Sequence, residues 1–496
     1  MATTTTVVRQ YGHFINGEEL PPSSDRIARH RPSDGTLVAE FSAGTPELAQ
    51  EAVQAARTAF EDGPWPHMSG VERARALQRL AGLIAENKED LARLDAEEVG
   101  TPLRQARGDL ETTVALTEYA AGLAMSLHGE VHSNLGPDLT GIIMREPAGV
   151  AGLITPWNFP VMLLAQKLPF ALAAGCTVVV KPSEFTSSTT LEVAKLTRSA
   201  GIPEGVVNVV TGTGPNVGQV LAESPDVDVL SFTGSTATGQ RIIETSKHTI
   251  KRLSLELGGK ASNIVFDDAD MDDALDGVLF GLLFNQGECC VSGSRLLVHE
   301  NIADEFLKLV RARIEKLRVG PPLEALTDVG PLIHDSHLAK VSDYVQTALA
   351  EGAELVTGGQ RLQLDGYDGG VYFPPTILDR VVPEATVFRE EIFGPVLSVT
   401  RFRDEEEAAW LANDVEFGLA NSVWTKNIDT AMRMSRALRS GTVWINTTID
   451  GAPQLPGGGV KTSGYGREMG QAGFEEFTEI KTVQIRTGAR TPFFGN

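Results

Sequence analysis

Two adjacent cysteines in a glycine- and serine-rich stretch are the residues best suited to covalent chemistry. Only three cysteines occur in 496 residues, and two of them, Cys289 and Cys290, lie within residues 284–295. A cysteine attacks as the thiolate, so a nucleophilic site must lower the thiol pKa or place a base nearby. Adjacent cysteines can also be simple packing residues, because free cysteine is often buried. The stretch alone leaves both interpretations open.

A carboxylate and an amide upstream could complete such a site. Glu256 lies between two leucines and ahead of Gly258 and Gly259. A carboxylate in partly apolar surroundings has a raised pKa and can act as a base near neutrality, although a glutamate at a strand end is often only solvated. Asn158 lies in a proline-flanked turn, where asparagine is common for conformational reasons. Its amide could also stabilise a developing oxyanion.

Polar residues at the ends of apolar segments could bind a dinucleotide. Lys181 and Glu184 lie just beyond the apolar residues 178–180, and residues 234–239 have the spacing G-x-x-x-x-G. The Lys-Ser/Thr of a nucleotide-triphosphate loop does not follow these glycines, so the turn is not a P-loop. Taken singly, each feature is more typical of a solvated strand end or a tight turn.

The elements that must position these residues alternate between strand and helix. From residue 149, short apolar strands alternate with helices, which is typical of a buried parallel sheet that binds ligands at the carboxyl ends of its strands. The strands are predicted at 150–154, 177–180, 206–210 and 229–232, and the helices at 161–174, 188–200, 216–223 and 237–247. A second such region spans 260–443, with strands near 262–266, 294–298, 354–357, 396–401 and 442–446.

The two ends of the chain differ from these regions. A hairpin with the turn Asn16-Gly17 and a helix capped by Thr45 are predicted after an N-terminal tail, residues 1–10, that does not resemble a signal peptide. Helices at 69–87 and 90–99 follow, and residues 478–486 alternate between apolar and polar at strand period. A terminal strand with an uncovered edge is a candidate for pairing between subunits.

Composition excludes several classes of function. A net charge of -22 argues against a nucleic-acid surface, and no stretch has the ~20 apolar residues of a membrane span. Three cysteines make no disulfide framework, so a reducing, cytoplasmic location is expected. Cysteine and histidine are not spaced as metal ligands, so no metal is expected.

Three stretches in one order carry a resemblance to a known family. They are residues 156–160 (PWNFP), residues 255–260 (LELGGK) and the stretch with the cysteines. With them the chain resembles the aldehyde dehydrogenase superfamily over about residues 14–485. The resemblance implies an NAD(P)-dependent enzyme that oxidises an aldehyde through a thiohemiacetal and a thioester. A CoA-acylating branch and a non-catalytic structural relative remain alternatives, and Glu256, as a base for hydrolysis, counts against the first.

The resemblance also implies a role for each candidate residue. Gly287 and Arg295 match the family pattern around the nucleophile, which places it on Cys290, whereas the usual glutamine is Glu288 here. Asn158 and the Cys290 N–H would stabilise the oxyanion, and Glu256 would activate the hydrolytic water. Glu184 would bind the adenosine ribose, which favours NAD over NADP. The implied cofactor-binding residues are Thr155, Pro156, Trp157, Lys181, Ser183, Glu184, Gly214, Phe232, Gly234, Ser235, Leu257, Glu391 and Phe393.

The implied substrate channel departs from the family. Gln166 and Gly457 occupy positions where an aromatic residue is usual, although Phe159 is retained. Removing large rings widens and wets a channel, which favours a longer, bulkier or more polar aldehyde than acetaldehyde. The channel residues are expected to be Phe159, Gln166, Cys289, Val291, Gly451 and Gly457.

The predicted fold class is α/β, with a doubly wound Rossmann-like cofactor domain, a second α/β catalytic domain and a small β oligomerisation element. The cofactor domain is expected at 1–124 and 147–258, interrupted by an oligomerisation segment at 125–146. The catalytic domain is expected at 259–462, and the C-terminal return with the oligomerisation strand at 463–496. A homo-oligomer, either a dimer or a tetramer, is expected.

Overall fold

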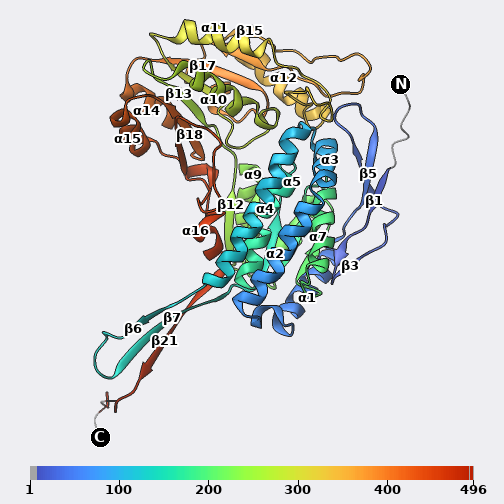
Figure 1. The fold of residues 1–496 in the computed structure, drawn as a ribbon, viewed down its shortest axis with the longest axis vertical. Helices are drawn as coiled ribbons and strands as arrows, with labels where there is room; N and C mark the ends of the chain where they lie inside the picture. Colours follow the sequence, from blue (N-terminus) through green and yellow to red (C-terminus); the bar gives the residue numbers. More distant parts are fainter. Residues whose placement is uncertain (1–7, 491, 495–496) are drawn as a thin grey trace.

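Two α/β lobes and a long β arm make up the structure, a computed structural model that describes residues 8–490 and 492–494 (Figure 1). The first lobe contains an eight-stranded sheet in the order β20-β12-β11-β8-β9-β10-β2-β3. Its five central strands run parallel: β12 (Arg252–Glu256), β11 (Val229–Thr233), β8 (Val150–Ile154), β9 (Thr177–Lys181) and β10 (Val207–Val209). The predicted doubly wound α/β fold is therefore confirmed, and the predicted apolar runs form these buried strands.

The edges of this sheet come from distant parts of the chain. The predicted hairpin forms β2 (Phe14–Ile15) and β3 (Glu18–Glu19), with Asn16 and Gly17 at φ 53° and 80°. At the other edge, β20 (Gly464–Tyr465) pairs antiparallel with β12. The C-terminal part of the chain thus returns to the first lobe beside Glu256.

Helices cover both faces of the first sheet. Thr45 caps α1 (Pro46–Glu61) as predicted, and Ser69 with Glu72 forms a capping box at α2 (Gly70–Glu86). The other helices are α3 (Lys88–Val99), α4 (Leu103–Ser126), α5 (Pro160–Ala165), α6 (Leu168–Ala174), α7 (Ser188–Ser199), α8 (Gln219–Glu223) and α9 (Thr236–Ser246).

One predicted helix is wrong. Residues 161–174 form two helices, α5 and α6, because the chain turns at Gln166 and Lys167. Pro169 in the first turn of α6 lacks an N–H and fits this break. The turn directs Lys167 into the protein, where it is fully buried.

The second lobe contains a seven-stranded sheet in the order β15-β16-β17-β14-β13-β18-β19. Its strands are β13 (Ser262–Val265), β14 (Arg295–His299), β15 (Glu354–Thr357), β16 (Thr376–Asp379), β17 (Val396–Phe402), β18 (Ala420–Trp424) and β19 (Thr442–Ile445). Its helices are α10 (Met271–Leu283), α11 (Ala303–Ile314), α12 (Asp335–Ala350), α13 (Thr386–Arg389), α14 (Glu405–Asn413) and α15 (Ile428–Ala437). The sequence predicted five of these strands and missed β16 and β18.

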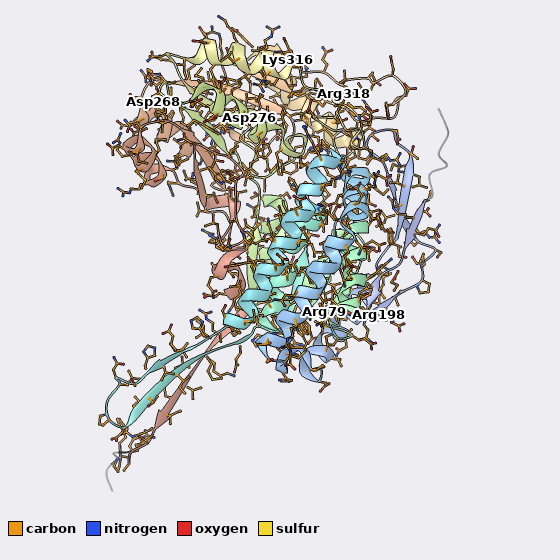
Figure 2. All side chains as sticks on the ribbon, viewed as in Figure 1. Arg79, Arg198, Asp268, Asp276, Lys316 and Arg318 are labelled. Carbon is orange, nitrogen blue, oxygen red and sulfur yellow. The ribbon has the colours of Figure 1, made fainter. Side chains whose placement is uncertain are left out.

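A long arm leaves the first lobe on the side away from the second lobe (Figure 1). It is a three-stranded sheet in which β7 (Leu139–Pro147) lies between β6 (Glu130–His132) and β21 (Thr478–Arg486). Figure 2 shows side chains standing on both faces of the arm, and Val131 and Ile480 are 68% and 61% exposed. The predicted terminal strand is confirmed, and its partner within the chain is β7. α16 (Gly470–Glu475) precedes it.

A smaller sheet lies at the N-terminal end of the described chain. It contains β1 (Arg9–Tyr11), β5 (Leu37–Ser42) and β4 (Arg26–His30), and Arg9 pairs with Glu97 at 2.8 Å. Residues 1–7 of the predicted tail lie outside the described residues, and the prediction is wrong for Arg9 and Gln10, which belong to β1. In the part of the chain that the structure describes, no helix has the length and hydrophobicity needed to cross a membrane.

Candidate active site

The stretch with the two cysteines forms a tight loop between α10 and β14. Its backbone turns at Asn285 and Gln286, which have left-handed φ angles of 50° and 56° although neither is glycine. Gly287 follows with φ 77°, and a Cβ there would lie 2.5 Å from the backbone of Gly394. Such conformations are costly and persist only where the surroundings fix them. The loop therefore holds the residues that follow it in one position.

The two cysteines lie in different surroundings. Cys289 is buried in an apolar cluster with Phe159 and Leu163, whereas Cys290 is partly exposed. Only a sulfur that a substrate can reach is able to attack. The geometry therefore favours Cys290 as the nucleophile.

The thiol of Cys290 is held in its protonated form. Its contact with the Cys289 thiol, its burial, and the nearby Glu391 and Glu256 carboxylates raise its pKa well above the ordinary value. A neighbouring negative charge opposes formation of the thiolate. Attack by Cys290 therefore needs a base that accepts its proton, and Glu256 is close enough to interact with it.

Asn158 is fixed against the same loop. It lies between β8 and α5, and its Nδ2 donates to the backbone oxygen of Glu288 at 2.9 Å. Its own backbone oxygen accepts from Asn285 Nδ2 at 2.7 Å. A side-chain amide carries two N–H donors, so one remains for an oxygen of a bound substrate. The arrangement suits an amide that stabilises a developing oxyanion.

Glu256 ends β12 and is almost fully buried. Its Oε1 has no hydrogen-bond partner among the described residues, and burial raises the pKa of its carboxyl. Gly458 lies so close that a Cβ there would be 2.6 Å from Glu256 Oε1, and its φ is 147°. A raised pKa suits a general base near neutral pH.

A buried ion pair that the sequence analysis missed lies near Glu256. Lys167 contacts Glu468, and Lys167 Nζ also donates to Ser231 Oγ at 3.1 Å. Burial lowers the pKa of Lys167, and Glu256 opposes this change. The turn between α5 and α6 directs Lys167 into the protein. The sequence could have indicated this burial only through a break in the predicted helix.

The carboxyl ends of the parallel strands form one edge of the candidate cofactor site. Lys181 ends β9, and its Nζ lies 3.2 Å from Glu184 Oε2. At the end of β11, Ser235 caps α9, accepting from Thr238 N with its Oγ at 3.3 Å. A helix N-terminus attracts phosphate, because its N–H groups and its dipole both favour negative charge.

The second lobe contributes the other side of this site. The rings of Trp157 and Phe393 meet edge-on at 5.4 Å, and Glu391 Oε1 accepts from Gly259 N at 2.9 Å. A Cβ on Gly258 would lie 2.7 Å from Glu391 Oε2, so a larger residue there would displace the Glu391 carboxylate. These contacts join the two lobes beside Cys290.

The remaining predicted cofactor residues lie along the same strand ends. Thr155 donates its N–H to the Lys181 oxygen at 3.2 Å, and Ser183 accepts from Phe185 N at 3.3 Å. A Cβ on Gly214 would meet nothing within 4 Å, so space is open beside it. The carboxyl ends of the parallel strands, a helix N-terminus and the Glu184 carboxylate together fit a dinucleotide. Pro156, Phe232, Gly234 and Leu257 lie in the same segments.

Three of the residues predicted to line the substrate channel lie together in the structure. Phe159, Cys289 and Val291 share one apolar cluster, to which Met162, Leu163 and Phe284 also belong. The rings of Phe159 and Phe284 stack at 5.3 Å, and the sequence analysis had not singled out Phe284. Of the other three predicted residues, Gln166 ends α5, and Gly451 and Gly457 lie in the segment after β19. A Cβ would meet nothing within 4 Å at Gly451, and only Met469 Cε at 3.1 Å at Gly457.

Glu288, where the chain departs from the family pattern, is directed at the segment before α12. Its Oε1 accepts from Ile333 N at 2.9 Å, and its side chain is fully buried. Burial raises the pKa of this carboxyl well above its ordinary value, which favours the neutral acid. The carboxylates that raise the pKa of Cys290 are instead Glu391 and Glu256.

The fold is a two-lobed α/β architecture in which Cys290 lies close to where the lobes meet. The profile of the aldehyde dehydrogenase family matches residues 20–483. A betaine aldehyde dehydrogenase of Bacillus subtilis (strain 168) is 43% identical over 475 residues, which cover 96% of this chain and 97% of that protein. The chain belongs to the aldehyde dehydrogenase family and is an NAD-dependent enzyme that oxidises an aldehyde to the carboxylic acid.

Two solved structures have the same fold. An NAD-dependent aldehyde dehydrogenase from Sinorhizobium meliloti is 46% identical with a TM-score of 0.96, covering 98% of this chain and 96% of that chain. A betaine aldehyde dehydrogenase from Staphylococcus aureus in complex with NAD+ is 38% identical with a TM-score of 0.96, covering 98% and 97%.

Proposed function

We propose that Cys290 is the nucleophile, Asn158 the oxyanion donor and Glu256 the base of this aldehyde oxidation. The observation that carries the proposal is the partly exposed residue Cys290, whose thiol lies close to a buried Glu256 with an Oε1 that has no partner among the described residues. The Cys290 sulfur bonds to the aldehyde carbon as its proton passes to Glu256, which then releases it to solvent, and a tetrahedral thiohemiacetal forms. The free N–H of Asn158 and the Cys290 N–H stabilise the oxyanion.

The second half of the reaction releases the acid. Bound NAD+ would supply the hydride acceptor, after which Cys290 holds a thioester. Glu256 takes a proton from water, the water oxygen attacks the thioester carbon, and the carbon–sulfur bond breaks. The net change consumes the aldehyde, NAD+ and water and yields the acid, NADH and a proton. NADH formation measured at increasing aldehyde concentration tests this function.

The proposed cofactor contacts divide between the lobes. Lys181 and Glu184 bind the adenosine ribose, Ser235 the pyrophosphate, and Glu391 and Phe393 the nicotinamide side. The support is the strand-end edge beside the N-terminus of α9 and the contact between Trp157 and Phe393. We propose a cofactor domain at residues 1–124 and 147–258, with the oligomerisation segment at 125–146 between its parts. The proposed catalytic domain spans 259–462, and the C-terminal return with the oligomerisation strand spans 463–496. The separate sheets of the two lobes and the arm support this division.

We propose that the substrate is bulkier or more polar than acetaldehyde. One wall of the proposed channel is apolar, with Phe159 stacked on Phe284, and the positions of Gly451 and Gly457 carry no side chain. The betaine aldehyde dehydrogenases named above act on an aldehyde of such size. A panel of acetaldehyde, hexanal, benzaldehyde and betaine aldehyde, ranked by kcat/KM, tests this proposal.

Gly457→Phe should narrow the channel. The added ring fills space that a Cβ shares only with Met469, so kcat/KM for the best bulky aldehyde should fall by at least about tenfold. The value for acetaldehyde should change less. Gly457→Ala is the control and should stay near the parent. A uniform loss across the panel in the phenylalanine variant would contradict the placement of Gly457 in the channel.

We propose that the arm joins subunits into a dimer or a tetramer. The outer edge of β21 has no strand partner among the described residues, and its exposed N–H and C=O groups are available for pairing. We also propose a cytoplasmic location, which the three free cysteines support.

Removing residues 478–496 should yield a monomer or an aggregate in size-exclusion chromatography with light scattering. This deletion takes away β21 and exposes the edge of β7. The control is a truncation after Arg486, which leaves β21 complete and should keep the parental mass. If the longer deletion also keeps that mass, the arm does not assemble the subunits.

A further inference from the structure

His337 lies between the loop that carries Cys290 and the segment that carries Phe393. Its Nε2 is 2.7 Å from the Phe393 oxygen and 3.6 Å from Glu288 Oε1. Its ring meets the ring of Trp157 at 5.7 Å, and the side chain is 8% exposed. One buried side chain therefore touches three segments of the proposed site.

The partners of His337 define which nitrogen carries its proton. Burial lowers the pKa of His337 to about 4, so the ring is neutral at physiological pH. A backbone oxygen only accepts, so the ring N–H that faces Phe393 is on Nε2. Nε2–H therefore donates to the Phe393 oxygen.

Phe393 needs such a restraint. Its φ is 64°, in the left-handed region that a bulky side chain rarely adopts. The ring nevertheless packs edge-on against Trp157 at 5.4 Å. A backbone conformation of this kind persists only where neighbouring groups hold it, and the bond from His337 is one of them.

The segment that precedes His337 also holds the cysteine loop. Ile333 donates its N–H to Glu288 Oε1 at 2.9 Å, and its oxygen accepts from Arg29 at 3.2 Å. Glu288 lies two residues before Cys290, and its backbone oxygen accepts from Asn158 at 2.9 Å. Residues 333–337 therefore bond to the cysteine loop through Ile333 and to the nicotinamide side through His337.

We propose that His337 is a positioning residue that sets the distance and orientation between the nicotinamide side of the cofactor and Cys290. It acts through its bond to Phe393, while the segment that carries it bonds to Glu288 through Ile333, and it does not itself touch the substrate. The inference rests on the proposed function, because Phe393 and Cys290 have their roles only there. The bond between Glu288 and Ile333 fixes the cysteine loop against the segment before α12.

The test compares His337→Met with His337→Gln in the full chain. The methionine removes the donor to Phe393, whereas the glutamine Nε2 can replace the histidine Nε2. His337→Met should raise both the Kd for NAD+, measured by calorimetry, and the KM for NAD+ by about five- to tenfold, and lower kcat by a similar factor. His337→Gln should stay within about twofold of the parent. His299→Met is the control, since His299 contacts Phe402 and Asp267 instead.

Coupling to Glu288 provides the second readout. Glu288→Met removes the acceptor of the Ile333 N–H, and its loss combined with that of His337→Met should be smaller than the product of the two single losses. Three results would overturn the inference. His337→Met could keep the parental Kd and kcat, the methionine and glutamine variants could lose equally, or the two losses in the double variant could be fully independent. Calorimetry needs no turnover, so a parent that forms no NADH would refute the proposed function while the Kd ratios still test His337.

Discussion

Cys290→Ala should abolish NADH formation, whereas Cys289→Ala should retain a large part of it. Only one sulfur can occupy the attacking position, and Cys290 is the partly exposed one. Loss of a nucleophile removes the covalent route altogether, so activity should fall below about a thousandth of the parent. Initial rates at saturating NAD+ and aldehyde measure both variants.

Cys289→Ala offers a more specific outcome. The Cys289 thiol is the largest cause of the raised pKa of Cys290, so its removal should lower that pKa. Iodoacetamide should then alkylate Cys290 at a lower pH than in the parent, because the thiolate is the reactive form. Equal loss of activity in the two alanine variants would count against the assignment of Cys290.

Glu256→Gln should form NADH once, more slowly than the parent because Glu256 also accepts the proton of Cys290, and then stall. Glutamine keeps the shape of the side chain but cannot accept a proton from water, so the thioester should accumulate. Removing a positioned base typically costs about 10²–10⁴ in rate. A stopped-flow trace should show up to one equivalent of NADH per active site, followed by almost none. Steady turnover near the parent rate would refute the role of Glu256 in hydrolysis.

The parallel sheet and the site motifs were predictable because they depend on local patterns. A strand buried on both faces is apolar along most of its length, as β8 and residues 178–180 of β9 are. β18 was missed because Asn421 and Ser422 are polar, and both are buried with hydrogen bonds to other strands or loops. Tertiary partners satisfy these side chains, and no local pattern shows such partners.

The surroundings of the candidate site residues could not be predicted from the sequence. The sequence left open which cysteine is accessible, and the answer depends on the apolar cluster around Cys289. It also left open the effect of Glu288, whose carboxyl bonds to Ile333, 45 residues away in the chain. The pairing of Lys167 with Glu468 likewise joins distant residues through a turn inside a predicted helix. These features follow from tertiary packing, which spacing alone does not determine.

The most direct test is mass spectrometry of Glu256→Gln quenched after one burst with NAD+ and a bulky aldehyde. Peptide mapping should find the acyl group of that aldehyde on Cys290 and leave Cys289 unmodified. This result requires that Cys290 attacks, that hydride transfer precedes hydrolysis, and that Glu256 serves the second step. An acyl group on Cys289, or a variant that forms neither NADH nor an acyl-enzyme, would contradict the account.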